Sequence, residues 1–360
     1  MASSSIRYFA TGNTAKGFHS LLASALQGLK RIIMLQGEPG CGKSTLIRQI
    51  GEALESRGTG VEWIHSAFAS SSVDGVIDRE AQLGVIAGSA RQADELTRAG
   101  VRFATIDLSH VLDAAKLGGK EAEIAKLANL VGEARTRAYA HFADALAIHD
   151  EWEKIYIANL DKDAANFVTE NMINMIFGKR EQAREGVMFH RFLGAATPDG
   201  AVDFIGNLTA GVNKRYFIKG RPGTGKSTML KRIAAVGAKR GYAAEVYHCG
   251  FDPDSLDMVI IRQLGVAIFD STAPHEYFPE RKNDEIIDMY ELAVADGTDE
   301  RFQEQLDHVK SRYAEKMKLG IEFLAQAQAS YNRLREIYVH AADFSGSEKI
   351  RAEIMADAIV

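Results

Sequence analysis

The feature that most limits the fold of this chain is a glycine-rich pattern that occurs twice. The first copy runs from Gly37 to Thr45 and the second from Gly220 to Thr228, 183 positions further along a chain of 360 residues. Both copies read Gly-x-x-x-x-Gly-Lys-Ser, the pattern of a phosphate-binding loop (P-loop) that joins a strand to a helix. The repetition predicts two α/β units of similar size.

The likeness between the two halves extends beyond these loops. At the same shift, His65 falls on His248 and Asp74 falls on Asp257. Matches spread across most of each half favour duplication over chance. We therefore predict a first P-loop domain over residues 1–182 and a second over residues 183–360. No Pro/Gly/Ser-rich linker separates them, so we expect them to pack together.

Short apolar runs alternate with amphipathic stretches in both halves, which predicts an α/β fold with doubly wound parallel sheets. Apolar runs at residues 32–35 and 216–218 lead into the loops, and helical spacing follows each loop. Further strands are expected at 61–64, 83–87, 244–247 and 265–269.

Each half ends in a long helical arm with apolar residues three, four or seven positions apart, a spacing typical of coiled-coil packing. The two arms match each other at a shift of 182, which places Ile155 on Ile337. We expect the arms to pack on each other or on a second copy of the chain. A helical arm kept for a separate partner is the alternative.

The P-loop pattern names the residues that would bind nucleotide. Glycines allow backbone N–H groups to surround phosphate oxygens, the lysine reaches the β- and γ-phosphates, and the serine hydroxyl binds Mg²⁺. The sequence thus predicts that ATP and Mg²⁺ bind at Gly37, Gly40, Gly42, Lys43, Ser44 and Thr45, and at Gly220, Gly223, Gly225, Lys226, Ser227 and Thr228.

Catalysis is predicted in the second half, because phosphoryl transfer needs acidic side chains as well as a phosphate cradle. Asp270 ends an apolar strand and resembles a Walker B acid, so with Ser227 and Ser44 it is a candidate metal ligand. Asp257 and Lys226 complete the predicted catalytic set. The first half has no acid at the position of Asp270, and the repeat does not support Asp107 as a substitute.

Three further features remain open between a functional and a structural role. Asp252 and Asp254 either face the γ-phosphate or cap a following helix. His248 ends a strand near the predicted phosphate site and is a candidate nucleotide contact. Arg281 and Lys282 either cover transferring phosphate or belong to a solvated loop.

Composition excludes several classes of protein. The formal net charge is −5, which argues against a dedicated nucleic-acid binder. No apolar run is long enough to predict a membrane span. Cys41 and Cys249 are too few for a disulfide scaffold or a zinc site, and they suggest reduced thiols in a cytoplasmic protein.

The chain resembles a group of bacterial proteins with tandem P-loop domains, labelled ATPase, ATP-binding protein or nucleotide kinase, that have no assigned substrate. The segments 248–257 and 269–275 carry most of the resemblance. It implies ATP binding and a P-loop fold.

These patterns predict Mg²⁺-dependent ATP hydrolysis at the second loop, with a binding or regulatory role for the first. A kinase that phosphorylates a nucleotide or small molecule is the alternative, as is an assembly or regulatory protein with slow turnover. The absence of an Asn-Lys-x-Asp guanine motif argues against a GTPase, and the absence of a Leu-Ser-Gly-Gly signature argues against an ABC cassette.

Overall fold

The computed structural model describes residues 5–69 and 71–356, which form an α/β fold around one large sheet. Twelve strands lie side by side in the order β16-β12-β15-β14-β13-β9-β1-β5-β6-β7-β4-β8. In the first half these strands are β1 (Ile6–Phe9), β4 (Arg31–Gln36), β5 (Glu62–His65), β6 (Val73–Asp78), β7 (Leu83–Ala87) and β8 (Ala104–Asp107). In the second half they are β9 (Val187–Phe192), β12 (Lys214–Lys219), β13 (Ala243–His248), β14 (Leu256–Ile261), β15 (Val266–Asp270) and β16 (Asp284–Asp288).

The helices and two short hairpins follow the same repeated order. The hairpins are β2 (Thr11–Thr14) with β3 (Gly17–Ser20) and β10 (Gly194–Thr197) with β11 (Gly200–Asp203). The α-helices up to the seam are α1 (Leu22–Ala25), α2 (Lys43–Ser56), α3 (Ala90–Arg98), α4 (Ala114–Leu117), α5 (Glu121–Ile157) and α6 (Lys162–Phe177). Those after it are α7 (Ile205–Leu208), α8 (Lys226–Lys239), α9 (Met289–Ala293), α10 (Thr298–Arg301), α11 (Gln303–Ala341) and α12 (Ser347–Ala356).

The prediction of purely parallel sheets is wrong, because the sheet is mixed. β6 runs antiparallel to β5 and β7, and β14 runs antiparallel to β13 and β15. The remaining pairs within each half are parallel. The segment after Asp254 is therefore a strand rather than a helix, which removes the helix-capping interpretation of Asp252 and Asp254.

The halves meet where β1 and β9 touch at their ends, through one antiparallel pair between Phe9 and Phe192. Helix α1 packs on β9 and α7 packs on β1, so one hydrophobic core extends across the seam. The expectation that the halves pack together without a linker is confirmed.

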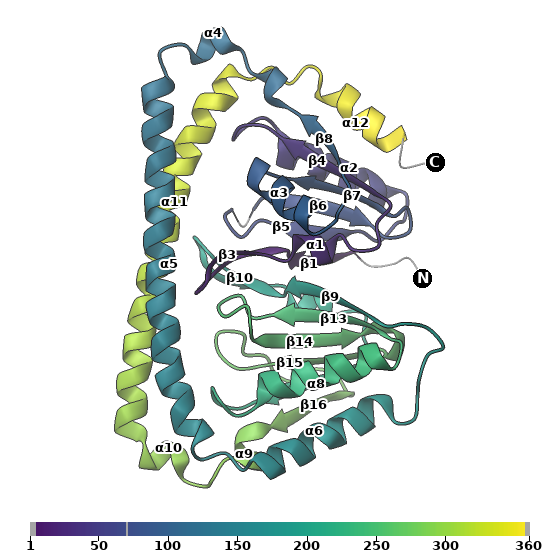
Figure 1. The fold of residues 1–360 in the computed structure, drawn as a ribbon, viewed down its shortest axis with the longest axis vertical. Helices are drawn as coiled ribbons and strands as arrows, with labels where there is room; N and C mark the ends of the chain where they lie inside the picture. The colour runs from purple at the N-terminus through teal and green to yellow at the C-terminus, as the bar shows by residue number, and fades with distance from the viewer. Residues whose placement is uncertain (1–4, 70, 357–360) are drawn as a thin grey trace.

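Helices α5 and α11 are the predicted arms, and they pack on each other along one side of the sheet (Figure 1). Their packing crosses the boundary of the sequence repeat. Helix α6 follows the first arm but packs on α8 of the second half, and α12 follows the second arm but packs on α2 of the first half (Figure 1). The arms therefore exchange the last helix of each repeat between the halves.

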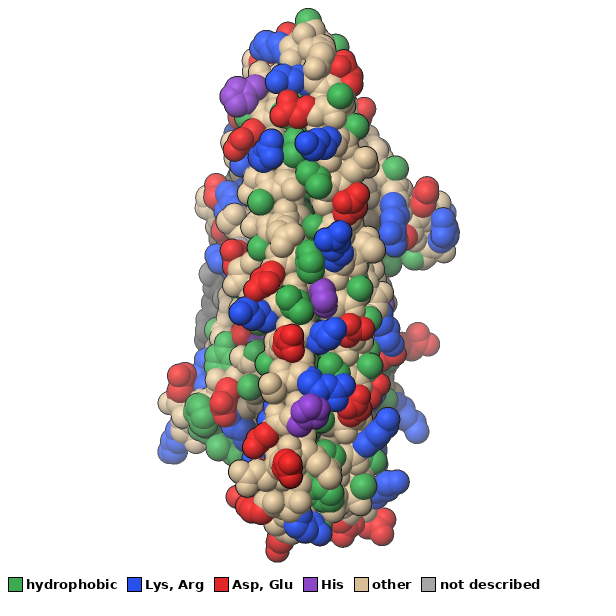
Figure 2. All heavy atoms as spheres, turned by 90° about the vertical axis from the view of Figure 1, so that its left-hand side faces the viewer, with side chains coloured by type: hydrophobic (Ala, Val, Ile, Leu, Met, Phe, Trp, Pro, Cys, Tyr) green, Lys and Arg blue, Asp and Glu red, His purple; other side chains and the backbone are tan. Residues whose placement is uncertain are grey.

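The outer side of the paired arms shows basic and acidic side chains intermixed, with hydrophobic side chains scattered among them (Figure 2). Two ion pairs join the arms there: Arg312 to Glu151 at 2.7 Å and Lys316 to Asp144 at 2.7 Å. None of the helices in residues 5–69 and 71–356 is both long and apolar enough to cross a membrane.

Candidate functional site

Each glycine-rich loop lies at the carboxyl end of a buried strand and opens into a helix. The first loop follows β4 and leads into α2, which begins at Lys43; the second follows β12 and leads into α8, which begins at Lys226. Gly42 and Gly225 precede these lysines with the same left-handed backbone, φ 87°. Because a side chain strains this conformation, glycine there allows the sharp entry into the helix.

The two lysines fold back over their own loops. Lys43 Nζ donates to the carbonyls of Gly37 at 2.6 Å and Glu38 at 2.8 Å. Lys226 Nζ donates to the carbonyl of Arg221 at 2.8 Å. Both ammonium groups thus lie in the concave side of a glycine-rich turn, where a phosphate oxygen could replace the carbonyls as their partner.

The two serines are also matched. Ser44 Oγ accepts from the Val73 amide at 3.1 Å, and Ser227 Oγ accepts from the Leu256 amide at 2.9 Å. Each hydroxyl is therefore held against the start of the antiparallel strand, β6 or β14. Ser44 Oγ also accepts from the Ser72 hydroxyl at 2.8 Å.

The second site brings together all of its predicted acids. Asp270 pairs in register with Ile218 on the neighbouring strand, and its Oδ2 atom lies 3.6 Å from Lys226 Nζ. Asp257 is half-buried on β14, where desolvation and then the charge of Asp270 raise its pKa to about 6. A carboxylate beside the lysine and a second carboxyl of raised pKa are the two acid types that phosphoryl transfer uses.

The first site keeps one of these acids and lacks the other. Burial raises the pKa of Asp74 to about 6, as it does for its counterpart Asp257. Ala87 occupies the position that matches Asp270, beside Leu35. Asp107 lies on the other side of β4, where its carboxylate caps the Ser109 amide at 2.8 Å. The carboxylate is thus already engaged in a turn.

The raised pKa of Asp257 predicts a pH-dependent stability. Its ordinary pKa is 3.8 and its folded pKa is about 6, so ionisation opposes folding increasingly as pH rises through this window. Asp257→Asn is therefore expected to raise the free energy of unfolding by about 1–2 kcal/mol at pH 8 and to leave it unchanged near pH 4. Urea unfolding at both pH values measures the difference, and an equal change at both would contradict burial as the cause.

Other predicted residues lie elsewhere. The ring nitrogens of His248 are engaged with the His190 ring at 2.8 Å and the Pro253 carbonyl at 2.5 Å, and burial lowers its pKa to about 4. Asp254 forms an ion pair with Lys16 from the β2–β3 hairpin. Arg281 donates to the Thr209 carbonyl at 3.1 Å, at the amino end of β12 and away from the loop. The interpretation of Arg281 as a phosphate cover is wrong in this arrangement.

Sequence reasoning missed the contribution of the arms to the two sites. An ideal Cβ on Gly223 would lie 2.7 Å from the Glu153 carbonyl of α5, and one on Gly40 would lie 2.9 Å from the Arg335 carbonyl of α11. The arm helices thus pack backbone-to-backbone against both glycine-rich loops. The shift of 182 that aligns the arms also aligns Glu153 with Arg335, which was the available signal.

An aromatic cluster accompanies the arm at the second site. The ring of His149 on α5 lies 6.3 Å from Phe251, which follows β13, and 5.9 Å from Tyr313 on α11. Burial lowers the pKa of His149, and the charge of Lys226 acts in the same direction. The neighbouring carboxylates of Glu153 and Asp150 act against this shift by raising the pKa.

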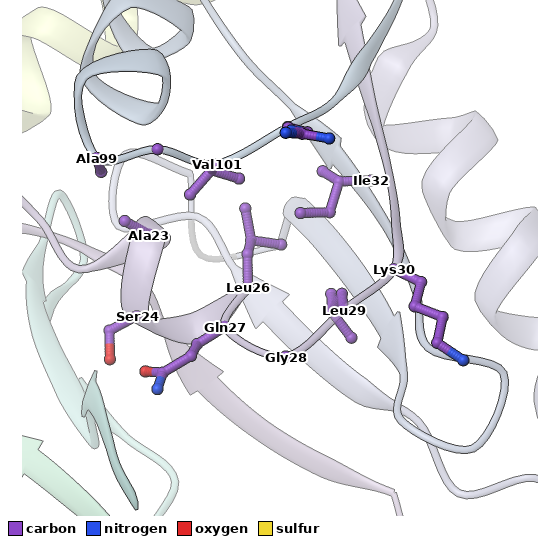
Figure 3. Close-up of a pocket in the computed structure, with 12 residues that line it drawn as sticks. Ala23, Ser24, Leu26, Gln27, Gly28, Leu29, Lys30, Ile32, Ala99 and Val101 are labelled. Carbon is purple, nitrogen blue, oxygen red and sulfur yellow. The ribbon is translucent and has the colours of Figure 1, made fainter.

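Two cavities lie beside the sheet. One of about 540 Å³ lies at the amino ends of the strands, between α1 and the segment before β8, and is remote from both phosphate loops (Figure 3). The other, of about 440 Å³, is lined by His110, Asp113 and Phe344 among others. It flanks the first loop, since an ideal Cβ on Gly42 would lie 3.3 Å from the Phe344 ring.

Comparisons with protein-family models, with curated proteins and with solved structures return no match for this chain. The resemblance to tandem P-loop proteins stays a prediction from the sequence.

Proposed function

We propose that the chain binds ATP at both glycine-rich loops and hydrolyses it at the second. The observation that carries this proposal is the group formed by Lys226, Ser227, Asp257 and Asp270 around one loop. Lys226, Ser227 and Asp270 are close enough to contact one phosphate group and its bound Mg²⁺ ion. Asp270 lies 3.6 Å from Lys226, and Ser227 follows Lys226 directly in the chain. Lys226 would bind the β- and γ-phosphates.

The oxygen atoms of Ser227 and Asp270 fit a Mg²⁺ ion, which prefers hydroxyl and carboxylate oxygens together with phosphate. The bound ion would neutralise charge that develops on the transferring phosphoryl group. Asp257, with a pKa of about 6, is the candidate to accept the proton of the attacking water. The first site lacks a counterpart of Asp270, which supports a binding or regulatory role there.

An ATPase whose two sites influence each other explains the packing of the arms on the loops better than a kinase does. Both loops are contacted by a helix that also packs on the other arm, so each site is completed across the two halves. A kinase that acts on a small-molecule acceptor would be supported by arginines that converge on the second loop. The arm side chain aligned there with Arg335 is the acidic Glu153 instead.

Lys226→Ala is expected to weaken ATP binding at the second loop by about ten- to hundredfold, because charge-assisted hydrogen bonds to phosphate are lost. Steady-state release of phosphate should fall with it. Lys43→Ala should weaken binding at the first loop while most turnover remains. Lys231→Ala, an exposed position on the same helix α8, serves as the control and should change neither.

These variants also test the assignment of the halves. Turnover that survives Lys226→Ala but is abolished by Lys43→Ala would place hydrolysis at the first loop. Phosphate that appears on an added metabolite rather than in solution would support the kinase.

A further inference from the structure

Helix α11 places one face along the first phosphate loop and the strand end beside it. Gln328 Nε2 donates to the Phe68 carbonyl at 3.4 Å, and the Tyr331 ring meets the Phe68 ring edge-on at 5.0 Å. Further along the same face, an ideal Cβ on Gly40 would lie 2.9 Å from the Arg335 carbonyl and 2.9 Å from Val339 Cγ2. These contacts fix the position of α11 relative to the loop.

Arg335 is an exposed cation on this face. Within residues 5–69 and 71–356 its guanidinium group has no hydrogen-bond or ion-pair partner. Arg312 on the same helix is paired with Glu151, and Arg135 on α5 donates to the Tyr139 hydroxyl at 2.9 Å. A guanidinium left unpaired beside a phosphate loop has its donors available for an anion.

Electrostatics place Arg335 in the same surroundings as the acid of the first site. Burial and then the charge of Asp74 raise the pKa of the Tyr331 hydroxyl, while Arg335 lowers it. Asp74 in turn is influenced by Lys43. Asp74, Tyr331 and Arg335 thus share one environment with the loop lysine.

We propose that Arg335 binds the γ-phosphate of a nucleoside triphosphate held at the first loop, so that the arm of the second repeat completes the site of the first. This inference rests on the proposed function, since it requires ATP at this loop. A planar guanidinium with five N–H donors matches phosphate oxygens, and it distinguishes a triphosphate from a diphosphate when it contacts the terminal group alone.

The matching position at the second loop carries the opposite charge. Glu153 on α5 corresponds to Arg335, and its backbone contacts Gly223 as that of Arg335 contacts Gly40. The arms thus add a positive charge to one phosphate loop and a negative charge to the other. The first site is expected to hold ATP more tightly than the second.

The short helix α10, which precedes α11, contacts the second loop. Asp299 on α10, just before α11, accepts from Arg221 Nη2 at 2.9 Å. Arg221 belongs to the second phosphate loop, so the consecutive helices α10 and α11 link a side chain at the second loop to Arg335 at the first. Occupancy of the first loop can thereby affect the second through a shift of α11.

The test uses full-length protein with Lys226→Ala in every variant, so that the first loop dominates binding. Affinities for ATP and ADP, both with Mg²⁺, are measured by titration calorimetry. Arg335→Ala is expected to weaken ATP binding by about ten- to hundredfold and ADP binding by less than about twofold. Arg335→Lys should recover part of the ATP affinity, because it keeps the charge and loses the planar fork.

Arg333→Ala is the matched control, since Arg333 is exposed two positions away on the same helix and should change neither affinity. Equal losses for ATP and ADP, or no loss for Arg335→Ala, would overturn the inference while the proposed function stands. If the Lys226→Ala parent binds no ATP, or if Lys43→Ala leaves its ATP affinity unchanged, both this inference and the proposed binding of ATP at the first loop would be overturned. Urea unfolding of each variant verifies that the fold is retained.

Discussion

Arg191→Met is expected to lower the free energy of unfolding by about 3 kcal/mol, because it removes one partner from a buried ion network. Arg191 is 2% exposed and lies on β9, at the seam between the halves. Its Nη2 atom donates to both carboxylate oxygens of Glu62, at 2.9 and 3.0 Å, and its guanidinium lies 4.4 Å from the centre of the Tyr8 ring. Methionine keeps much of the volume and loses every donor.

The size of this effect depends on what remains around the two acids. Glu62 keeps its ion pair with Arg79 at 3.0 Å, and Glu245, which lies 3.6 Å from Arg191, keeps Arg262 at 2.6 Å. Neither acid is therefore left wholly unpaired, so we expect the lower end of the range for a broken buried pair, about 3–5 kcal/mol. Arg79→Met is the control and should cost less, because Arg79 is more exposed.

The pH dependence supplies a second measurement of the same pair. Burial alone would raise the pKa of Glu62, but the charges of Arg191 and then Arg79 lower it to about 2. Because the folded pKa lies below the ordinary value of 4.5, this stabilisation is complete above pH 4.5 and is lost as pH falls toward 2. In Arg191→Met, the free energy of unfolding should therefore fall less steeply as pH is lowered from 4.5 toward 2. Unfolding in urea at pH 7 and at pH 3 would reveal it, and a steep loss retained in the variant would contradict the assignment.

The sequence repeat indicated the two acids of this ion network but not the arginine between them. The repeat aligns Glu62 with Glu245 but aligns Tyr8 with Arg191, so the central cation has no counterpart in the first half. Nothing in a single chain reveals that two repeats will meet through corresponding strands. The role of Arg191 follows only from the pairing of β1 with β9, which is a long-range contact.

The strand–turn–helix structure of the glycine-rich loops was predictable because it is local. A strand, a glycine-rich turn and a helix are consecutive in the chain, and the pattern specifies each of them. The antiparallel strand β14 could not be predicted in the same way, because the run from Leu256 to Ile261 is short and mostly apolar. For a run of that length, periodicity does not distinguish a buried strand from a buried helical segment.

For the arms, too, the local structure could be predicted from the sequence, whereas their long-range packing could not. Their apolar spacing predicted two long helices that pack on each other or on a second copy of the chain, and α5 and α11 pack on each other. It could not show that α5 covers the second loop and α11 the first, because helix packing depends on shape across the whole molecule. Gly40 and Gly223 have two roles: they permit the loop backbone, and their lack of a side chain allows an arm helix to pack against the loop.

Gly223→Ala is expected to lower the free energy of unfolding by about 2–5 kcal/mol, from backbone strain and from overpacking together. The backbone at Gly223 has φ +77°, and the added methyl would lie 2.7 Å from the Glu153 carbonyl and 3.0 Å from Ile157 Cγ1. The Glu153 carbonyl cannot yield easily, because it is helix backbone. The loop or α5 must therefore move, and ATP binding at the second loop should weaken as well.

Gly58→Ala separates the two causes. Gly58 has φ +84° and nothing within 4 Å of the added methyl, so this variant experiences the backbone strain without the clash. It is expected to cost about 1 kcal/mol and to leave ATP affinity unchanged, since strain of this kind alone is worth about 1–3 kcal/mol. Urea unfolding and ATP titration of the two variants compare them directly. Equal losses of stability would mean that α5 does not press on the loop in solution, and that the arms are separable from the phosphate sites.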